Sequence, residues 1–237
     1  MPPRRGALSP AAAASNPPQP ARRCPTGPGR TAPPAAATAW LALGMSERTT
    51  TVITWSLEQT SPQDLAAVQE PDGASGIRIV RAEVPSPEFS RFLYTAVGGD
   101  ITWLDRLPWT YETWRAHLAR PGVETWVAYE HGTPAGYVEL EAQGEGTVEI
   151  VYFGLIPAFR GRRIGGHLLS YGTARAWDLA GRWPGLAPTK RVWVHTCSLD
   201  GEHAVANYER RGFRLFRTES EEQPEAAPPG PWPGAHA

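Results

Sequence analysis

The sequence predicts an α/β fold of the α+β type, with a mixed, mostly antiparallel sheet flanked by helices. Between residues 125 and 155, three strand-like runs are separated by short glycine-containing turns, which is typical of an antiparallel meander. A helical pattern over 164–179 then leads to another strand pattern over 190–197. This order is typical of a strand, helix, strand crossover, so strands of both directions are expected in one sheet.

Composition divides the 237 residues into a foldable middle and two ends that are expected to be disordered. Residues 1–44 are mainly Ala, Pro, Gly and Arg, and residues 219–237 are rich in Pro, so neither end has enough apolar material to offset the entropy of ordering. Met45 stands where the composition changes. Residues 1–44 are therefore either a gene-model extension, with translation starting at Met45, or a genuine disordered leader. The remaining residues, roughly 170, suffice for one core without disulfides or metals.

The middle is expected to consist of a peripheral strand and linker over 45–75 and a main domain over 76–218. A β-branched run over 50–56 predicts the peripheral strand. In the main domain, apolar periodicity and turn residues predict the other elements. These are strands over 76–84, 125–130, 135–142, 147–155, 190–197 and 213–218, and helices over 86–97, 111–119, 164–179 and 201–211.

Bulk properties exclude several classes of protein. The formal net charge is −1, so no overall field attracts the chain to nucleic acid or to an anionic membrane. Pro and Arg interrupt the Ala-rich residues 1–44, so neither a membrane span nor a signal peptide is expected. The two cysteines, Cys24 and Cys197, make a structural disulfide unexpected and fit a cytoplasmic protein. No metal-ligand spacing occurs, so no metal is expected.

The most informative segment is the turn between the strand over 147–155 and the helix over 164–179. Its residues are Arg160, Gly161, Arg162, Arg163, Ile164, Gly165 and Gly166. Backbone amides at a helix start have no intrahelical acceptor, so they bind phosphate oxygens, and glycines let the backbone approach closely. No Lys followed by Ser or Thr comes after the glycines, and Gly-x-Gly-x-x-Gly is absent, which argues against a P-loop and a Rossmann site.

This turn resembles the signature of the GNAT superfamily of acyl-CoA-dependent N-acetyltransferases. That signature has Gln or Arg, two residues, Gly, one residue, and then Gly or Ala. Arg160 fills the first position and Gly165 the last, whereas Arg163 stands where the signature has its first glycine. The resemblance extends over about 76–218 and implies the mixed sheet of that family.

A second region of the resemblance lies downstream. Ala204, Tyr208 and the pair Gly212 and Phe213 look like the usual residues around the last helix of the family. Ala204 and Tyr208 are four residues apart and share a helix face, and Gly212 is placed as the helix C-cap. The Asn that is common seven residues before the Tyr is Gly201 here.

The resemblance implies direct transfer of an acyl group, acetyl by default, from coenzyme A to an amine in a ternary complex. By resemblance to the histone-type members, Glu149 is the expected base, directly or through water, and Tyr208 the acid that protonates the thiolate. A backbone amide near Phe153 to Leu155 is expected to polarise the thioester carbonyl. The expected cofactor-binding residues are Phe153, Leu155 and the seven residues of the turn.

Each role has an alternative. Glu149 alternates with apolar neighbours, as a solvent-facing strand residue does, and Tyr208 is compatible with a core position. His195 is an alternative base, although a lone histidine in a buried strand is more often hydrogen-bonded core. Cys197 invites a covalent mechanism, but buried thiols are usually inert. The aromatic residues over 101–114 are expected to pack in the core, and the alternative is that they line a substrate pocket.

Three functional classes remain open. The leading hypothesis is an N-acetyltransferase that uses acetyl-CoA and acts on a small-molecule or peptide amine. The principal rival is a non-catalytic domain that binds acyl-CoA as a sensor or interaction module. The third is a nucleic-acid binder that uses the Arg-rich turn, which the absence of net positive charge disfavours. No nucleic-acid or membrane partner is therefore expected, and a homodimer is left open because dimers are common in the family.

Overall fold

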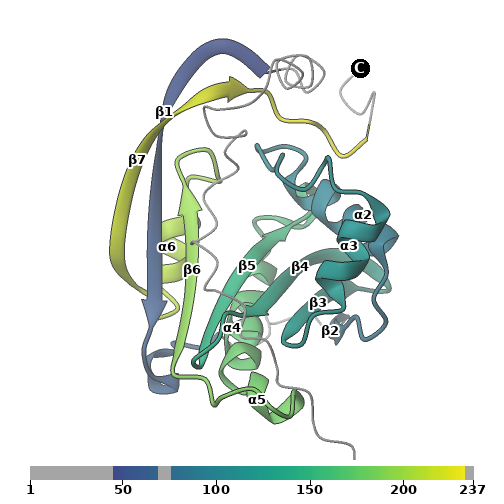
Figure 1. Cartoon of the computed structure of the whole chain (residues 1–237), viewed down its shortest axis with the longest axis vertical. Coiled ribbons are helices and arrows are strands. Elements are labelled where there is room, and N and C mark those ends of the chain that lie inside the picture. Colours follow the sequence, from purple (N-terminus) through teal and green to yellow (C-terminus); the bar gives the residue numbers. More distant parts are fainter. Residues whose placement is uncertain (1–44, 69–75, 233–237) are drawn as a thin grey trace, which may run out of the picture.

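One sheet with strands of both directions organises the molecule. The computed structural model describes residues 45–68 and 76–232, and in this part of the chain the strand order is β2-β3-β4-β5-β6-β1-β7 (Figure 1). The strands are β1 (Met45–Gln59), β2 (Ile77–Arg81), β3 (Val123–Glu130), β4 (Thr133–Ala142), β5 (Thr147–Leu155), β6 (Arg191–Cys197) and β7 (Arg214–Ala226). Neighbouring strands are antiparallel, except that β5 and β6 are parallel. The predicted mixed, mostly antiparallel sheet is confirmed.

Helices flank this sheet, as Figure 1 shows. They are α2 (Pro87–Gly98), α3 (Tyr111–Leu118), α4 (Ile164–Trp177), α5 (Leu179–Arg182) and α6 (Ala204–Glu209), with short 3-10 segments η1 (Pro62–Asp64) and η2 (Pro157–Phe159). The helix predicted over 164–179 ends at Trp177, and α5 follows after one residue. The other predicted helices correspond to α2, α3 and α6, with α6 shorter than expected.

Two apolar clusters lie on opposite faces of the sheet. Leu140 and Ile150 pack with Leu168 of α4 in the larger cluster. Tyr137 packs with Leu93 of α2 in the second cluster, which is rich in aromatic rings. Successive side chains of a strand point to opposite faces, so β4 contributes to both clusters. The sheet therefore separates the cluster packed against α4 from the cluster packed against α2 and α3.

The strands nearest the two ends of the chain differ from the sequence prediction. β1 lies between β6 and β7, whereas a peripheral strand was expected. β7 continues to Ala226, so residues 219–226 are ordered as strand, not as part of the expected disordered tail. The register with β1 runs from Glu58↔Arg214 to Met45↔Ala226. Backbone pairing orders this segment although most of its side chains are exposed, which composition cannot reveal. Residues 1–44 and 233–237 lie outside the described residues.

Gly212 joins α6 to β7 at a position that only glycine fits. Its φ is +85°, and a Cβ built there would lie 1.7 Å from the carbonyl oxygen of Asp64. We expect Gly212→Ala to reduce the free energy of unfolding by more than about 2 kcal/mol, because the left-handed backbone and the clash add together. Urea unfolding measures this loss. Gly181→Ala is the matched control, since a Cβ there meets no atom within 4 Å. Equal stability of the two variants would contradict the prediction.

Candidate active site

The site lies where two neighbouring strands separate. β5 pairs with β6 only from Thr147↔Arg191 to Ile150↔Val194, although β5 continues to Leu155. A pocket of about 460 Å³ occupies this region. Its lining includes Trp103 and Asp105 from the segment between α2 and α3, residues 150–155 of β5, part of the 160–166 turn, His195 and Tyr208. The expected site residues are thus largely brought to one pocket.

The first turn of α4 has no side-chain cap, whereas the first turns of α2 and α3 are capped. The Ser86 hydroxyl accepts a hydrogen bond from an amide in the first turn of α2, and Thr110 does the same for α3. α4 begins at Ile164 without a side-chain cap. Among the described residues, no protein acceptor is recorded for the amides of residues 161–166. These donors, with the positive end of the helix dipole, form a site suited to an anion beside the pocket.

Backbone conformation explains why glycine is favoured at two positions of the turn. Gly161 has φ +74°, and Arg163, which precedes α4, has φ +64°. Both values lie in the left-handed region, where a side chain costs roughly 1–2 kcal/mol. Arg163 nevertheless occupies the position of the first signature glycine, at some cost in strain. Its side chain lies at the pocket wall.

The three arginines of the turn have different surroundings. Arg160 donates to the carbonyl oxygens of Leu155 (3.1 Å) and Val97 (3.2 Å) and forms an ion pair with Asp100. Arg162 pairs with Glu130 and does not line the pocket. Arg163 lines the pocket, and no partner is recorded for its guanidinium among the described residues. Arg163 is thus the arginine of the turn that is free to meet an anion, and Arg160 ties the turn to α2.

The glycines of the turn line the pocket, whereas Ile164 packs in the core. Gly161, Gly165 and Gly166 line the pocket. Ile164 is 2% exposed and belongs to the cluster on the α4 side of the sheet. It therefore anchors the first turn of α4 while the glycines on either side remain accessible.

Glu149, which is buried, pairs with His195, which is partly buried and lines the pocket. Oε1 of Glu149 lies 3.3 Å from Nδ1 of His195, close enough for an ion pair when the ring is protonated, although the atoms are not aligned for a hydrogen bond. The Glu149 carboxylate also accepts from Gln143, whose own oxygen accepts from the Trp193 ring nitrogen at 3.0 Å. Glu149 is completely buried and does not line the pocket, whereas His195 does.

Tyr208 presents a protonated hydroxyl to the same pocket. Its ring packs on Phe153 and Phe213, with ring centroids 6.1 and 6.0 Å away. Burial raises the pKa of the Tyr208 phenol well above its ordinary value, and the nearby charge of Asp200 raises it further. No hydrogen bond of this hydroxyl is recorded among the described residues. Tyr208 therefore keeps a proton at neutral pH that it can donate to a group in the pocket.

Strand β5 offers unpaired backbone to the pocket. Glu139↔Tyr152 and Leu140↔Ile150 are successive pairs with β4, which leaves Val151 as a bulge. Beyond Ile150 the edge of β5 that faces β6 has no strand partner. Phe153 and Leu155 both line the pocket here. Backbone groups along this edge are thus available to a bound molecule, as expected for the segment 153–155.

A buried charged group next to the pocket was missed by the sequence prediction. Arg106 is fully buried and donates to both oxygens of Glu139 at 2.9 and 2.8 Å, while His117 contacts the same carboxylate at 2.8 Å. The guanidinium lies 4.4 Å from the ring centroid of Tyr152. The only sequence signal was the adjacent Asp105 and Arg106 within an aromatic stretch, since their partners are distant in the chain.

The aromatic segment serves both purposes that the sequence left open. Trp114 is 1% exposed and belongs to the cluster beneath α2, which confirms the preference for core packing. Trp103 belongs to that cluster as well, yet it also lines the pocket. Tyr152 contacts Trp103 with ring centroids 4.7 Å apart and lines the pocket too. Core packing and the pocket wall therefore share the same rings.

Cys197, the candidate for a covalent mechanism, is a buried free thiol that does not line the pocket. His203 and Asn207, at and within α6, line the pocket beside Tyr208. Over residues 45–68 and 76–232, no group of three or more His, Cys, Asp or Glu residues could hold a metal ion. In the same part of the chain, the helices are too short or too polar to span a bilayer.

The open helix start beside two separating strands defines the class of protein. The sequence model of the acetyltransferase (GNAT) family matches residues 86–213, a segment that contains the turn, the separating strands and α6. The chain belongs to this family. No curated protein is similar enough in sequence to match the chain.

Solved structures show the same fold. A GCN5-related N-acetyltransferase from Kribbella flavida superimposes with a TM-score of 0.52 at 17% identity, over 81% of this chain and 64% of that chain. A GCN5-related N-acetyltransferase from Sphaerobacter thermophilus gives a TM-score of 0.52 at 19% identity, over 83% of this chain and 57% of that one. The chain thus spans less than two thirds of either protein, and at these identities the similarity concerns the fold alone.

Proposed function

We propose that the protein transfers an acyl group, acetyl by default, from acetyl-CoA to a primary amine of a small-molecule or peptide acceptor. The observation that carries this proposal is the uncapped start of α4, whose free amides lie beside a pocket that continues between β5 and β6. Acyl-CoA combines a pyrophosphate with a thioester on a long arm, so an anion site joined to a long opening between strands suits it.

The residues that would hold acyl-CoA follow from their positions. The amides of residues 161–166 and the Arg163 guanidinium bind the pyrophosphate. Phe153 and Leu155 contact the arm, and an amide on the unpaired edge of β5 stabilises the negative charge that develops on the carbonyl oxygen. Acyl-CoA supplies the acyl group in activated form, as a thioester.

Proton transfer is assigned to three residues. The His195 ring accepts the proton that the acceptor nitrogen loses as it bonds to the acyl carbon, and Glu149 stabilises the charged ring from behind. Since Glu149 is buried and does not line the pocket, it acts through His195. Tyr208 donates its proton to the sulfur when the carbon–sulfur bond breaks, and it recovers a proton from solvent.

The turn is tested by placing a charge at Gly165. A Cβ there would meet its nearest atom, Leu155 Cδ1, at 3.4 Å, so a small side chain fits. We expect Gly165→Asp to weaken coenzyme A binding by at least about 10-fold, because a carboxylate would repel the phosphates. Titration calorimetry with coenzyme A measures this. Gly165→Ala separates bulk from charge and should bind more tightly than the Asp variant.

The enzymatic part of the proposal has a separate readout. Thiol release from acetyl-CoA is followed against a set of amines with the wild type and Gly165→Asp. Release that depends on an amine and is lost in the variant at low acetyl-CoA concentration supports acyl transfer. Coenzyme A binding without release for any amine would instead favour a binding module, and unchanged affinity in Gly165→Asp would remove the proposed site.

A further inference from the structure

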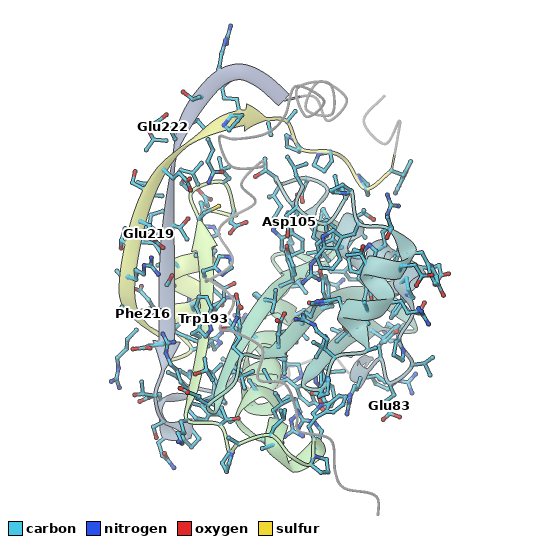
Figure 2. All side chains as sticks on the ribbon, in the orientation of Figure 1. Glu83, Asp105, Trp193, Phe216, Glu219 and Glu222 are labelled. Carbon is cyan, nitrogen blue, oxygen red and sulfur yellow. The ribbon has the colours of Figure 1, made fainter. Side chains whose placement is uncertain are left out.

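Asp105 is a carboxylate at the pocket wall that is held in place by neutral donors. It lies in the segment between α2 and α3, beside the opening that faces β6 (Figure 2). The Tyr94 hydroxyl donates to Oδ1 at 2.6 Å, and the Tyr152 hydroxyl lies 2.7 and 2.6 Å from the two carboxylate oxygens. Burial, followed by the charge of Asp105, raises the pKa of both phenols, so both stay protonated and donate. Neither donor neutralises the charge of Asp105.

Asp105 also lacks a cationic partner within the described residues, in contrast to its neighbours. Asp100, on the same segment, pairs with Arg160. The adjacent Arg106 is committed to Glu139 by two hydrogen bonds and is completely buried, so it cannot turn towards the pocket. No ion pair of Asp105 is recorded. A fixed carboxylate without a counterion, facing a pocket, is suited to a cation that comes with a ligand.

The rings around Asp105 suit the same kind of ligand. Trp103 and Tyr152 line the pocket with Asp105, and their ring centroids are 4.7 Å apart. Aromatic faces attract ammonium and guanidinium groups through the negative potential above the ring. Other residues that line the same pocket, Arg163 and the glycines of the turn with its free amides, provide positive potential. The pocket therefore combines a site suited to an anion with a different set of residues suited to a cation.

We infer that the acceptor carries a second cationic group, an ammonium or guanidinium, which Asp105 binds while another amine of the same molecule is acylated. This inference rests on the proposed function for the reacting amine. The two groups must differ, because a carboxylate stabilises the protonated form of an amine and so suppresses its nucleophilicity. Asp105 therefore anchors the acceptor, and the nitrogen near His195 reacts. One carboxylate provides for one extra positive charge, so a diamine or a basic amino acid derivative is the expected class.

Binding is measured first, because it does not require turnover. In the presence of coenzyme A, alkane diamines of increasing length are titrated calorimetrically beside the monoamines of equal length. We expect the best diamine to bind at least about 10-fold more tightly than its monoamine. Asp105→Asn, which keeps the size of the side chain and one acceptor oxygen for the tyrosines, should remove this preference. Asp178→Asn, a change at a carboxylate outside the pocket, should retain it.

The outcomes separate this inference from the proposed function. If no diamine binds more tightly than its monoamine, or if Asp105→Asn keeps the preference, the role of Asp105 is overturned. If monoamines and diamines are acetylated with equal kcat/KM, acyl transfer stands and the second cation is wrong. If the preference is present and depends on Asp105 but no amine is acetylated, the cation site stands and the enzymatic proposal fails. Equal melting temperatures of both variants exclude misfolding as the cause.

Discussion

Replacing His195 with alanine should lower kcat by about 100-fold or more while the affinity for coenzyme A stays unchanged. His195 lines the pocket, and the buried Glu149 lies 3.3 Å behind it. Without the ring, no side chain in this position accepts the proton from the attacking nitrogen. Steady-state thiol release at saturating acetyl-CoA, with calorimetric binding of coenzyme A, measures both parts of the prediction.

The roles of the two residues are separated by rescue. Free imidazole should restore part of the activity of His195→Ala, because it can occupy the space of the missing ring next to Glu149. It should not restore activity to Glu149→Gln, in which the ring is present but its charged partner is missing. Wild-type kcat in His195→Ala would show that another group accepts the proton, and loss of coenzyme A binding would show that the change disturbs the pocket more widely.

Replacing Glu139 with glutamine should reduce the free energy of unfolding by about 3–5 kcal/mol. The carboxylate accepts two hydrogen bonds from Arg106, and both side chains are almost completely buried. The variant leaves the guanidinium charged and without a counterion in a water-free environment, which is far more costly than losing an exposed ion pair. Urea unfolding measures the loss.

The double variant Arg106→Met, Glu139→Leu is the control for this prediction. Removing both charges together should cost less than Glu139→Gln alone, because no unpaired charge remains. A loss below about 1 kcal/mol in Glu139→Gln would mean that water reaches the guanidinium, contrary to its complete burial.

The Glu139 carboxylate should make the folded state less stable as the pH falls. Burial by itself raises the pKa of Glu139, but the Arg106 charge and His117 more than offset burial, so the folded pKa lies well below its ordinary value of 4.5. The unfolded chain therefore binds a proton that the folded chain does not, as the pH falls below about 4.5. The stability from this pair is present above that pH and is lost below it, and Glu139→Gln should lack this part of the acid dependence.

Much of the fold could be predicted from the sequence, because the patterns that indicate strands, turns and helices involve residues close together in the chain. The strand over 147–155 has the predicted bounds, and the turn after it leads directly into α4 as predicted. Alternation, glycine turns and helical periodicity each involve residues only a few positions apart. The extension of β7 to Ala226 was missed because it depends on pairing with β1, more than 150 positions away in the sequence.

Part of the candidate site could also be predicted, because some of its residues are close together in the sequence. The turn proposed to bind an anion consists of seven consecutive residues, so the sequence predicts it as one unit. The pair of Glu149 and His195 depends on the parallel register that places Glu149 opposite Trp193, two residues before His195. The sequence predicts Glu149 as the base and His195 as the alternative, but it could not show that Glu149 lies behind His195. Asp105 was not singled out at all.

The sequence by itself determined the order of the elements, the glycine-containing turn before α4 and the resemblance to the family, because these follow from neighbouring residues. Only the tertiary structure decided which carboxylates have counterions: Glu139 is paired with Arg106 from 33 positions away, whereas Asp105 meets only tyrosine hydroxyls at the pocket wall. The physical reason is that the free energy of a charge depends on burial and on partners brought together by folding, and neither is a property of the local sequence.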